Sequence, residues 1–271
     1  MYKRQIRETE NTLILQDQIE QRTGIWVETL SNSEQRFLDY KSIASKGETF
    51  RRIIEEKTAI LDIGGGSIQI SLFDKDTLVS TQNLRLGVLR LQELLNHLNA
   101  GSTQMERLVD ELATAQLDDY KKLYLKDREI KNIIIVDDYL SPWAVRKAHE
   151  RGEVNAVVDR KAFSQLMEAL RTKGTTELAK RMDIAEEKVP LVYISAILTR
   201  RIAELMGAEL VWAPGVTLCD GIAYEYAEQN KMFRGEHDFA EDIIACALNI
   251  SKRYNGSSKS CLLYTSDAAD D

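Results

Sequence analysis

The chain has 271 residues, of which 44% are apolar and 29% are charged, and its formal net charge is −7. This composition is typical of a globular protein of one or two domains, and it lacks the basic character of a nucleic-acid-binding surface. No apolar run reaches the roughly 18 residues of a membrane-spanning helix, and the three cysteines form no C-x-x-C pair. We therefore expect a cytoplasmic protein that binds neither nucleic acid nor membrane and has no disulfide framework.

The apolar spacing predicts helices alternating with strands, which is typical of an α/β fold with helices packed on a sheet. In chain order we expect a helix over 7–22, a strand over 25–30, a helix over 34–44, a polar connection over 46–56, a hairpin that starts over 58–72 and returns over 77–84, helices over 86–98 and 104–125, a strand over 133–136, a helix over 142–149, a strand over 154–158, helices over 163–170, 176–181 and 190–206, a strand over 210–213, and helices over 216–229 and 239–254.

Both ends of the chain look artificial. Residues 1–5 and 261–265 can be encoded by the two strands of one short DNA, which resembles the mosaic end of transposon-based sequencing libraries, and 266–271 read as adapter sequence. Segments of this kind do not belong in an argument about the fold. We expect the natural protein to continue beyond both ends, so that the chain is a fragment that is inactive by itself.

The most informative stretch is residues 58–72, TAILDIGGGSIQISL. An apolar strand leads to Asp62, and Gly64, Gly65, Gly66 and Ser67 precede a second alternating strand. Three consecutive glycines let backbone N–H groups approach a ligand closely, and converging amides form an anion-binding concavity. A carboxylate beside such a turn can hold Mg²⁺. The pattern indicates a loop that binds phosphate and a metal ion, and a glycine-rich turn without a ligand is the alternative.

Other known phosphate loops do not fit this stretch. No G-K-[ST] follows the glycines, as a P-loop requires. A strand also follows where the dinucleotide-binding fingerprint requires a helix.

Several further segments point to one family. They are R-E-x-x-N at 7–11, IWVE at 25–28, EQR at 34–36, DIGGGS at 62–67, LGVxR at 86–90 and WAPGVTLCDGIA at 212–223. With these segments the chain resembles the exopolyphosphatase / guanosine pentaphosphate phosphatase family of the actin-like ATPase superfamily. The resemblance implies a partial first lobe over 1–56, an α/β, actin-like (ribonuclease H-like) second lobe over 57–230, and the start of a helical C-terminal domain over 231–260.

The resemblance also implies a chemistry, in which two lobes close on a phosphate chain and an activated water attacks the terminal phosphorus with the help of Mg²⁺. Glu34 matches the catalytic glutamate that positions or deprotonates the water. Asp62 matches the aspartate that handles the metal, the glycine loop with Ser67 matches the second phosphate loop, and Arg7 matches a phosphate-binding arginine. The implied substrate is inorganic polyphosphate or guanosine pentaphosphate, and a homodimer of the whole protein is compatible with the family.

Alternatives remain open for several of these residues. Glu34 can instead be a helix-terminal acid that the macrodipole favours, and Arg7 can be a solvated charge. Asp137 and Asp138 stand where the family has a glycine-rich loop, and we interpret them as a loop with a helix cap. The alternative functions are a phosphotransferase of the same superfamily and a non-catalytic sensor of nucleotides or polyphosphate.

The pair His237-Asp238 is compatible with a metal-dependent phosphohydrolase. The other histidines have no suitable context for completing such a site. We therefore expect Asp238 to be the N-cap of a helix.

Overall fold

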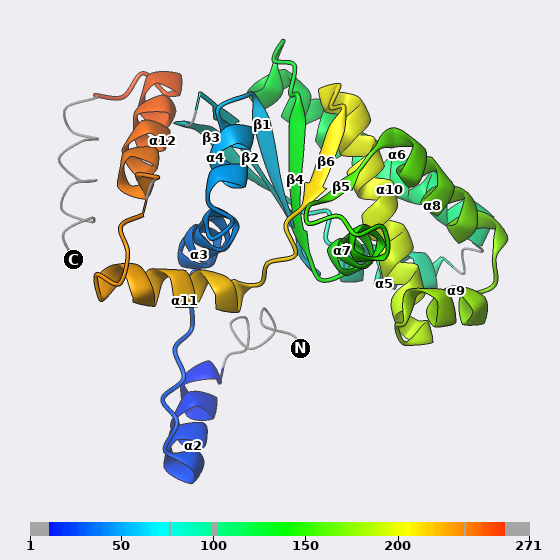
Figure 1. Cartoon of the computed structure of the whole chain (residues 1–271), viewed down its shortest axis with the longest axis horizontal. Helices are drawn as coiled ribbons and strands as arrows, with labels where there is room; N and C mark the ends of the chain where they lie inside the picture. The colour runs from blue at the N-terminus through cyan, green and yellow to red at the C-terminus, as the bar shows by residue number, and fades with distance from the viewer. Residues whose placement is uncertain (1–10, 76, 99–101, 236, 258–271) are drawn as a thin grey trace.

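The computed structural model describes residues 11–75, 77–98, 102–235 and 237–257. In this part of the chain a six-stranded sheet lies between two groups of helices (Figure 1). The order of the strands across the sheet is β3-β2-β1-β4-β6-β5. This mixed α/β architecture confirms the fold class that the alternating apolar patterns predict.

The strands lie close to their predicted positions. They are β1 (Thr58–Ile63), β2 (Ile68–Asp74), β3 (Thr77–Leu84), β4 (Asn132–Asp137), β5 (Ala156–Val158) and β6 (Leu210–Ala213). β1 pairs antiparallel with β2 and parallel with β4. The carboxyl ends of β1 and β4 therefore meet at one edge of the sheet, where Asp62 lies opposite Val136 and Ile63 lies opposite Asp137.

The described helices connect and cover these strands. They are α2 (Thr12–Thr23), α3 (Asn32–Ala44), α4 (Glu48–Ile54), α5 (Val88–His97), α6 (Ser102–Tyr120), α7 (Leu140–Glu150), α8 (Arg160–Thr172), α9 (Thr175–Met182), α10 (Val189–Met206), α11 (Leu218–Gln229) and α12 (Phe239–Arg253). A π-helical turn (Lys121–Leu125) follows α6, and a 3₁₀ turn (Glu186–Lys188) precedes α10. None of the helices in these ranges has the length and the apolar character needed to cross a bilayer.

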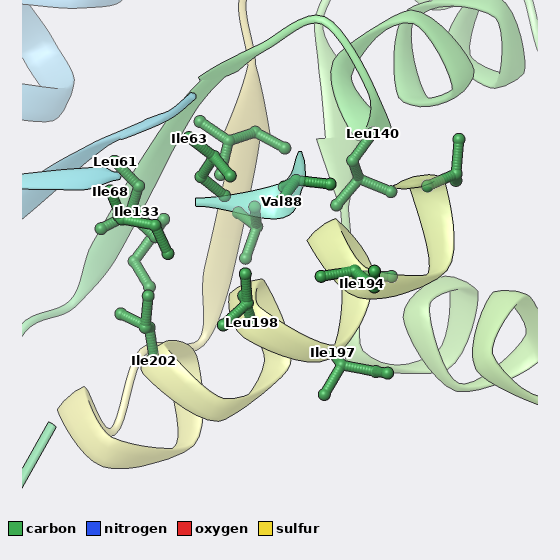
Figure 2. Packing of buried hydrophobic residues seen from close by; sticks show 14 of the residues in the cluster. Leu61, Ile63, Ile68, Val88, Ile133, Leu140, Ile194, Ile197, Leu198 and Ile202 are labelled. Carbon is green, nitrogen blue, oxygen red and sulfur yellow. The ribbon is translucent and has the colours of Figure 1, made fainter. Parts of the chain in front are cut away.

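One face of the sheet is covered by α5 to α10. The helix α10 is apolar on nearly all sides, as expected of a helix in the centre of a core, and most of its residues are buried. In Figure 2 side chains of α10, among them Leu198 and Ile202, point toward those of the sheet, among them Ile63 and Ile133. This core fixes the strands whose ends carry the candidate site.

The opposite face of the sheet is covered by α3 and α4. Tyr40 and Ile43 of α3 and Phe50 of α4 pack with Ile60 of β1 and Trp212 of β6. Both helices precede the domain boundary predicted at residue 56, and both share this core with the sheet. Because side chains alternate along a strand, Asp62 lies on the same face as Ile60, so it faces α3.

Two predictions of secondary structure are wrong. The segment 46–56, expected as a polar connection, contains α4, which forms because Phe50 and Ile54 on one side of a short helix are both buried in the core. The segment 25–30, expected as a strand, pairs with no other strand in the described part of the chain, and Trp26 is 72% exposed. Its apolar residues have no neighbouring strand with which to form a ladder.

α11 crosses α3 at very short range. A Cβ at Gly221 would lie 2.0 Å from the backbone oxygen of Leu38, so only glycine permits this crossing. Farther along, Lys41 of α3 forms ion pairs with Glu225 and Glu228 of α11. The crossing therefore fixes the position of α3 above the sheet.

α12 covers the edge strand β3. The carboxylate of Asp242 accepts a hydrogen bond from the Leu78 N–H at 2.9 Å, and it contacts the His237 ring at 2.6 Å. The side-chain amide of Asn249 donates to the backbone oxygen of Val79. An edge strand protected in this way cannot pair with another chain. Asp238 accepts hydrogen bonds from two amides in the first turn of α12, which confirms it as the N-cap.

Candidate active site

The glycine loop joins β1 to β2 as the sequence predicts. Ile63 and Ile68 form the last pair of an antiparallel hairpin, and the N–H of Gly64 donates to the oxygen of Ser67 at 3.0 Å. None of the loop glycines has the positive φ that only glycine adopts easily. Their value at this turn is therefore the absence of a Cβ, which lets other groups approach the backbone.

The N-terminus of α5 packs directly on this loop. The amides of Val88 and Leu89 donate to the oxygens of Gly64 and Gly65, at 3.0 and 2.9 Å, so the loop caps the helix. A Cβ at Gly87 would lie 2.1 Å from the carbonyl carbon of Gly66. This close approach explains the Leu86-Gly87-Val88 segment, because any larger residue would push the helix off the loop.

Capping orients the loop backbone. Its carbonyl oxygens point toward α5, and within the described ranges no backbone oxygen accepts from the N–H of Gly65 or Gly66. The loop is only partly buried. Two amides beside the positive end of the α5 dipole can therefore donate to an anion.

Arg90 is a cation at the same loop. Its Nε donates to the oxygen of Gly66 at 3.3 Å, and the side chain is exposed. Because a guanidinium has five N–H donors in a planar fork, one bond to the loop leaves the two terminal nitrogens able to bind phosphate oxygens. The sequence placed Arg90 in a family motif but did not indicate this role.

Asp62 lies in an acidic environment one residue before the end of β1. Burial, and then the charges of Asp137 and Asp138, raise the pKa of its carboxyl from an ordinary 3.8 to about 6. Arg36 and a hydrogen bond with Asp39, both from α3, act in the opposite direction. A carboxyl with excess acidic charge around it is one that a cation would stabilise.

Asp137 behaves as the expected helix cap. Its carboxylate accepts from the amides of Leu140 and Ser141, at 2.8 and 2.6 Å, and from the hydroxyl of Ser195 at 2.7 Å. These bonds confirm a capping role, because they occupy both carboxylate oxygens. Asp62 accepts no such capping bonds from the amides of the described residues.

Glu34 lies at the start of α3, where it forms a capping box. The Glu34 carboxylate accepts a hydrogen bond from the Ser31 amide at 2.5 Å, and the Ser31 hydroxyl accepts one from the backbone amide of Glu34. These bonds lower the pKa of the exposed Glu34 carboxyl. At about 100° per residue, Glu34 and Arg36 lie on opposite sides of α3, and Arg36 is on the side of Asp62.

The structure therefore brings together only part of the predicted site. Asp62 and the loop from Gly64 to Ser67 form one unit at the sheet edge. The Glu34 carboxylate is bound to the Ser31 amide instead, and Arg7 lies outside the described residues. Two residues that the sequence analysis did not assign, Asp39 and Arg90, do belong to the unit.

The described part of the chain has no group of three or more His, Cys, Asp or Glu side chains that could hold a metal ion. The Asp62 carboxylate offers oxygen donors of the kind that Mg²⁺ prefers, and Mg²⁺ commonly binds through one or two carboxylates, with waters and phosphate oxygens as its remaining ligands. The donor set therefore fits a magnesium ion that arrives with a phosphate ligand, and it does not fit a closed protein cage.

The sequence profile of the Ppx/GppA phosphatase family matches residues 4–230. The chain belongs to this family. Its class of enzyme is therefore that of a phosphatase, a hydrolase acting on phosphoanhydride bonds, as the resemblance implied. Among curated proteins no sequence matches the chain.

Solved structures show the same fold. The Ppx/GppA family member of Aquifex aeolicus has a TM-score of 0.67 and 13% identity, over 83% of this chain and 72% of that one. An exopolyphosphatase from Cytophaga hutchinsonii has a TM-score of 0.67 and 16% identity over the same shares. An exopolyphosphatase-like protein has a TM-score of 0.65 and 17% identity, over 83% and 74%. These likenesses confirm the actin-like fold of the Ppx/GppA family.

Proposed function

We propose that this Ppx/GppA phosphatase releases the terminal phosphate group of inorganic polyphosphate or of guanosine pentaphosphate. The observation that carries the proposal is the capped glycine loop beside Asp62, in a chain of this family. The loop presents two amides at the end of β1, next to a carboxylate suited to a metal ion. This combination favours binding of a phosphate group together with its cation.

The binding step follows from the groups at the loop. We expect the amides of Gly65 and Gly66 to donate to oxygens of the phosphate next to the bond that is cleaved. Arg90 would hold the same phosphate from the side, since its Nε already fixes the guanidinium on the loop. Fixed donors of this kind lower the barrier because they need no rearrangement as charge develops.

A magnesium ion fits this site and would be held by Asp62. When bound, it would neutralise charge on the phosphate oxygens. At neutral pH the Asp62 carboxyl, whose pKa is about 6, is ionised, and Arg36 favours that form. Arg7 is proposed as a further phosphate contact from the segment before α2.

Glu34 is proposed to position or deprotonate the attacking water. To act on the water, the Glu34 carboxylate would have to give up its hydrogen bond to the Ser31 amide. The substrate would also have to contact α3 on the side that faces away from Asp62. The capping box observed for Glu34 favours a second candidate, a sensor that binds polyphosphate or a nucleotide without hydrolysing it. Turnover is what separates the two functions.

Phosphate release is the test of the proposal. The whole natural protein is incubated with inorganic polyphosphate, with guanosine pentaphosphate or with ATP, each with Mg²⁺, and free phosphate is measured over time. Release from the first or second substrate but not from ATP is the expected result. Binding of either compound, measured by calorimetry, without any release would instead establish the sensor, and transfer from ATP to an acceptor would establish a phosphotransferase.

Arg90→Ala is expected to weaken substrate binding more than it slows turnover. A hydrogen bond to a charged group contributes about 1.5–3 kcal/mol, so KM or Kd should rise by about 10- to 100-fold. Arg90→Lys should recover only part of the loss, because an ammonium lacks the planar fork. Calorimetric titration with tripolyphosphate measures the effect, and the exposed Arg85→Ala is the matched control. Equal affinities in the two alanine variants would remove Arg90 from the site.

A further inference from the structure

A cavity lies between α4, α11 and the segment that leads to α12. Its volume is about 240 Å³. Its lining comes from the end of α3 at Ala44 and the turn after it, from Phe50, Arg51 and Ile54 of α4, and from Tyr224, Phe233 and Arg234. None of these residues belongs to the candidate active site.

The cavity has an apolar floor and an aromatic wall. Phe50 and Ile54 form the floor and are fully buried, with 2% and 0% exposure. The rings of Tyr224 and Phe233 form the wall, in an edge-to-face arrangement with their centroids 4.7 Å apart. Flat apolar surfaces of this kind bind planar ring systems well, because stacking adds to the burial of apolar area.

The rim of the cavity is cationic. Arg51 and Arg234 line it and are exposed, although the whole chain carries a net charge of −7. The hydroxyl of Ser45 and the phenol of Tyr224 add polar groups that can form hydrogen bonds with ring edges. The ligand that this combination favours is therefore aromatic at one end and anionic at the other.

The size of the cavity limits the ligand further. Sites for drug-sized molecules measure about 300–1,000 Å³, so 240 Å³ accommodates one ring system and not a whole nucleotide. We propose that this cavity is a binding site for a nucleoside phosphate, with the base between Tyr224, Phe233 and Phe50 and with the phosphates at Arg51 and Arg234. Arginine suits that rim because its planar fork matches phosphate oxygens.

This site differs from the proposed substrate site. The unit formed by Asp62, Asp39, the glycine loop and Arg90 contributes no residue to the lining of the cavity. A nucleotide whose phosphates lie at Arg51 and Arg234 therefore does not occupy the glycine loop, and it acts as an effector. α3 is the element through which the two sites would communicate, since Arg36 and Asp39 in the middle of the helix act on Asp62 and Ala44 at its end lines the cavity.

The test is calorimetric titration of the whole chain with ADP and with GDP, without substrate, so that it does not depend on catalysis. We expect at least one nucleotide to bind in the micromolar range. Phe233→Ala and Arg234→Ala should each weaken binding by about tenfold. Tyr226→Ala, on the exposed side of α11, and the exposed Arg160→Ala are the matched controls and should leave binding unchanged.

Competition separates this site from a phosphate site. An excess of tripolyphosphate should fail to displace the nucleotide, because the base supplies much of the affinity. The proposal is overturned if neither nucleotide binds, if tripolyphosphate displaces it completely, or if both variants bind as tightly as the controls. Thermal unfolding of every variant is followed by circular dichroism, and a variant that has lost its fold is replaced by Phe233→Leu or Arg234→Gln, which keep the size of the side chain.

Discussion

Glu34→Gln is expected to reduce phosphate release by about 10²- to 10⁴-fold, the usual contribution of a general base. The substitution removes the carboxylate while it keeps an oxygen that can accept from the Ser31 amide. Because Gln serves at this position of a capping box as well as Glu does, α3 should begin at the same residue. The loss of activity should therefore occur without a change in the melting temperature.

Glu48→Gln is the matched control. Glu48 is also an exposed acid in the first turn of a helix, but α4 lies at the other end of α3 from the glycine loop. Its substitution should leave both activity and melting temperature unchanged. If Glu34→Gln turns over polyphosphate at the rate of the unsubstituted chain, Glu34 is a cap and no more, and the water must be activated by another group.

The structure explains why the glycine loop was predictable and its surroundings were not. The turn is encoded within fifteen consecutive residues, and its strands pair with each other. Asp39 became part of the site only because α3 crosses the carboxyl end of β1, a contact between segments more than twenty residues apart. Helical spacing places Asp39, Tyr40 and Ile43 on one face, but it does not say which strand that face covers.

The same limit applies to the secondary structure that was missed. α10 was predicted well because eighteen residues carry its apolar pattern. α4 has seven residues, and its two buried side chains, Phe50 and Ile54, are too few to distinguish a helix from a connection. The strand predicted at 25–30 rested on β propensity, which reports how a side chain fits against neighbouring strands more than an intrinsic preference.

Glycines show a related limit. A Cβ added at Gly87 or at Gly221 would lie about 2 Å from a neighbouring backbone atom, in the glycine loop for Gly87 and in α3 for Gly221. Each of these glycines stands near the start of a helix, and the local sequence pattern there indicates only a weak helix cap. Only the packing of α5 and α11 shows that these two residues position the loop and the helix of the candidate site.

Asp62→Asn is expected to abolish phosphate release and, at the same time, to stabilise the fold at neutral pH. The pKa of Asp62 is about 6 in the folded chain and 3.8 in the unfolded chain, so folding favours the protonated carboxyl. Its stabilising effect is complete below pH 3.8 and is lost as the pH rises through 6. The cost at pH 7 is at most about 3 kcal/mol, which a neutral asparagine avoids.

Urea unfolding at several pH values, without divalent cations, measures this difference. The free energies of unfolding of the two proteins should agree near pH 4, and Asp62→Asn should become the more stable one between pH 4 and pH 7. The exposed Asp118→Asn is the control and should follow the unsubstituted chain at every pH. If Asp62→Asn is instead less stable than the unsubstituted chain at pH 7, favourable interactions of the carboxylate outweigh the cost of its burial.

Magnesium then tests the role of the same carboxylate as a metal holder. A ligand that binds only the folded state raises stability by an amount that grows with its concentration. Millimolar Mg²⁺ with tripolyphosphate should therefore raise the melting temperature of the unsubstituted chain and of Asp118→Asn, but not that of Asp62→Asn. An equal rise in all three proteins would mean that the ion binds elsewhere. The buried Asp62 carboxylate would then lower the stability of the fold without holding the metal ion.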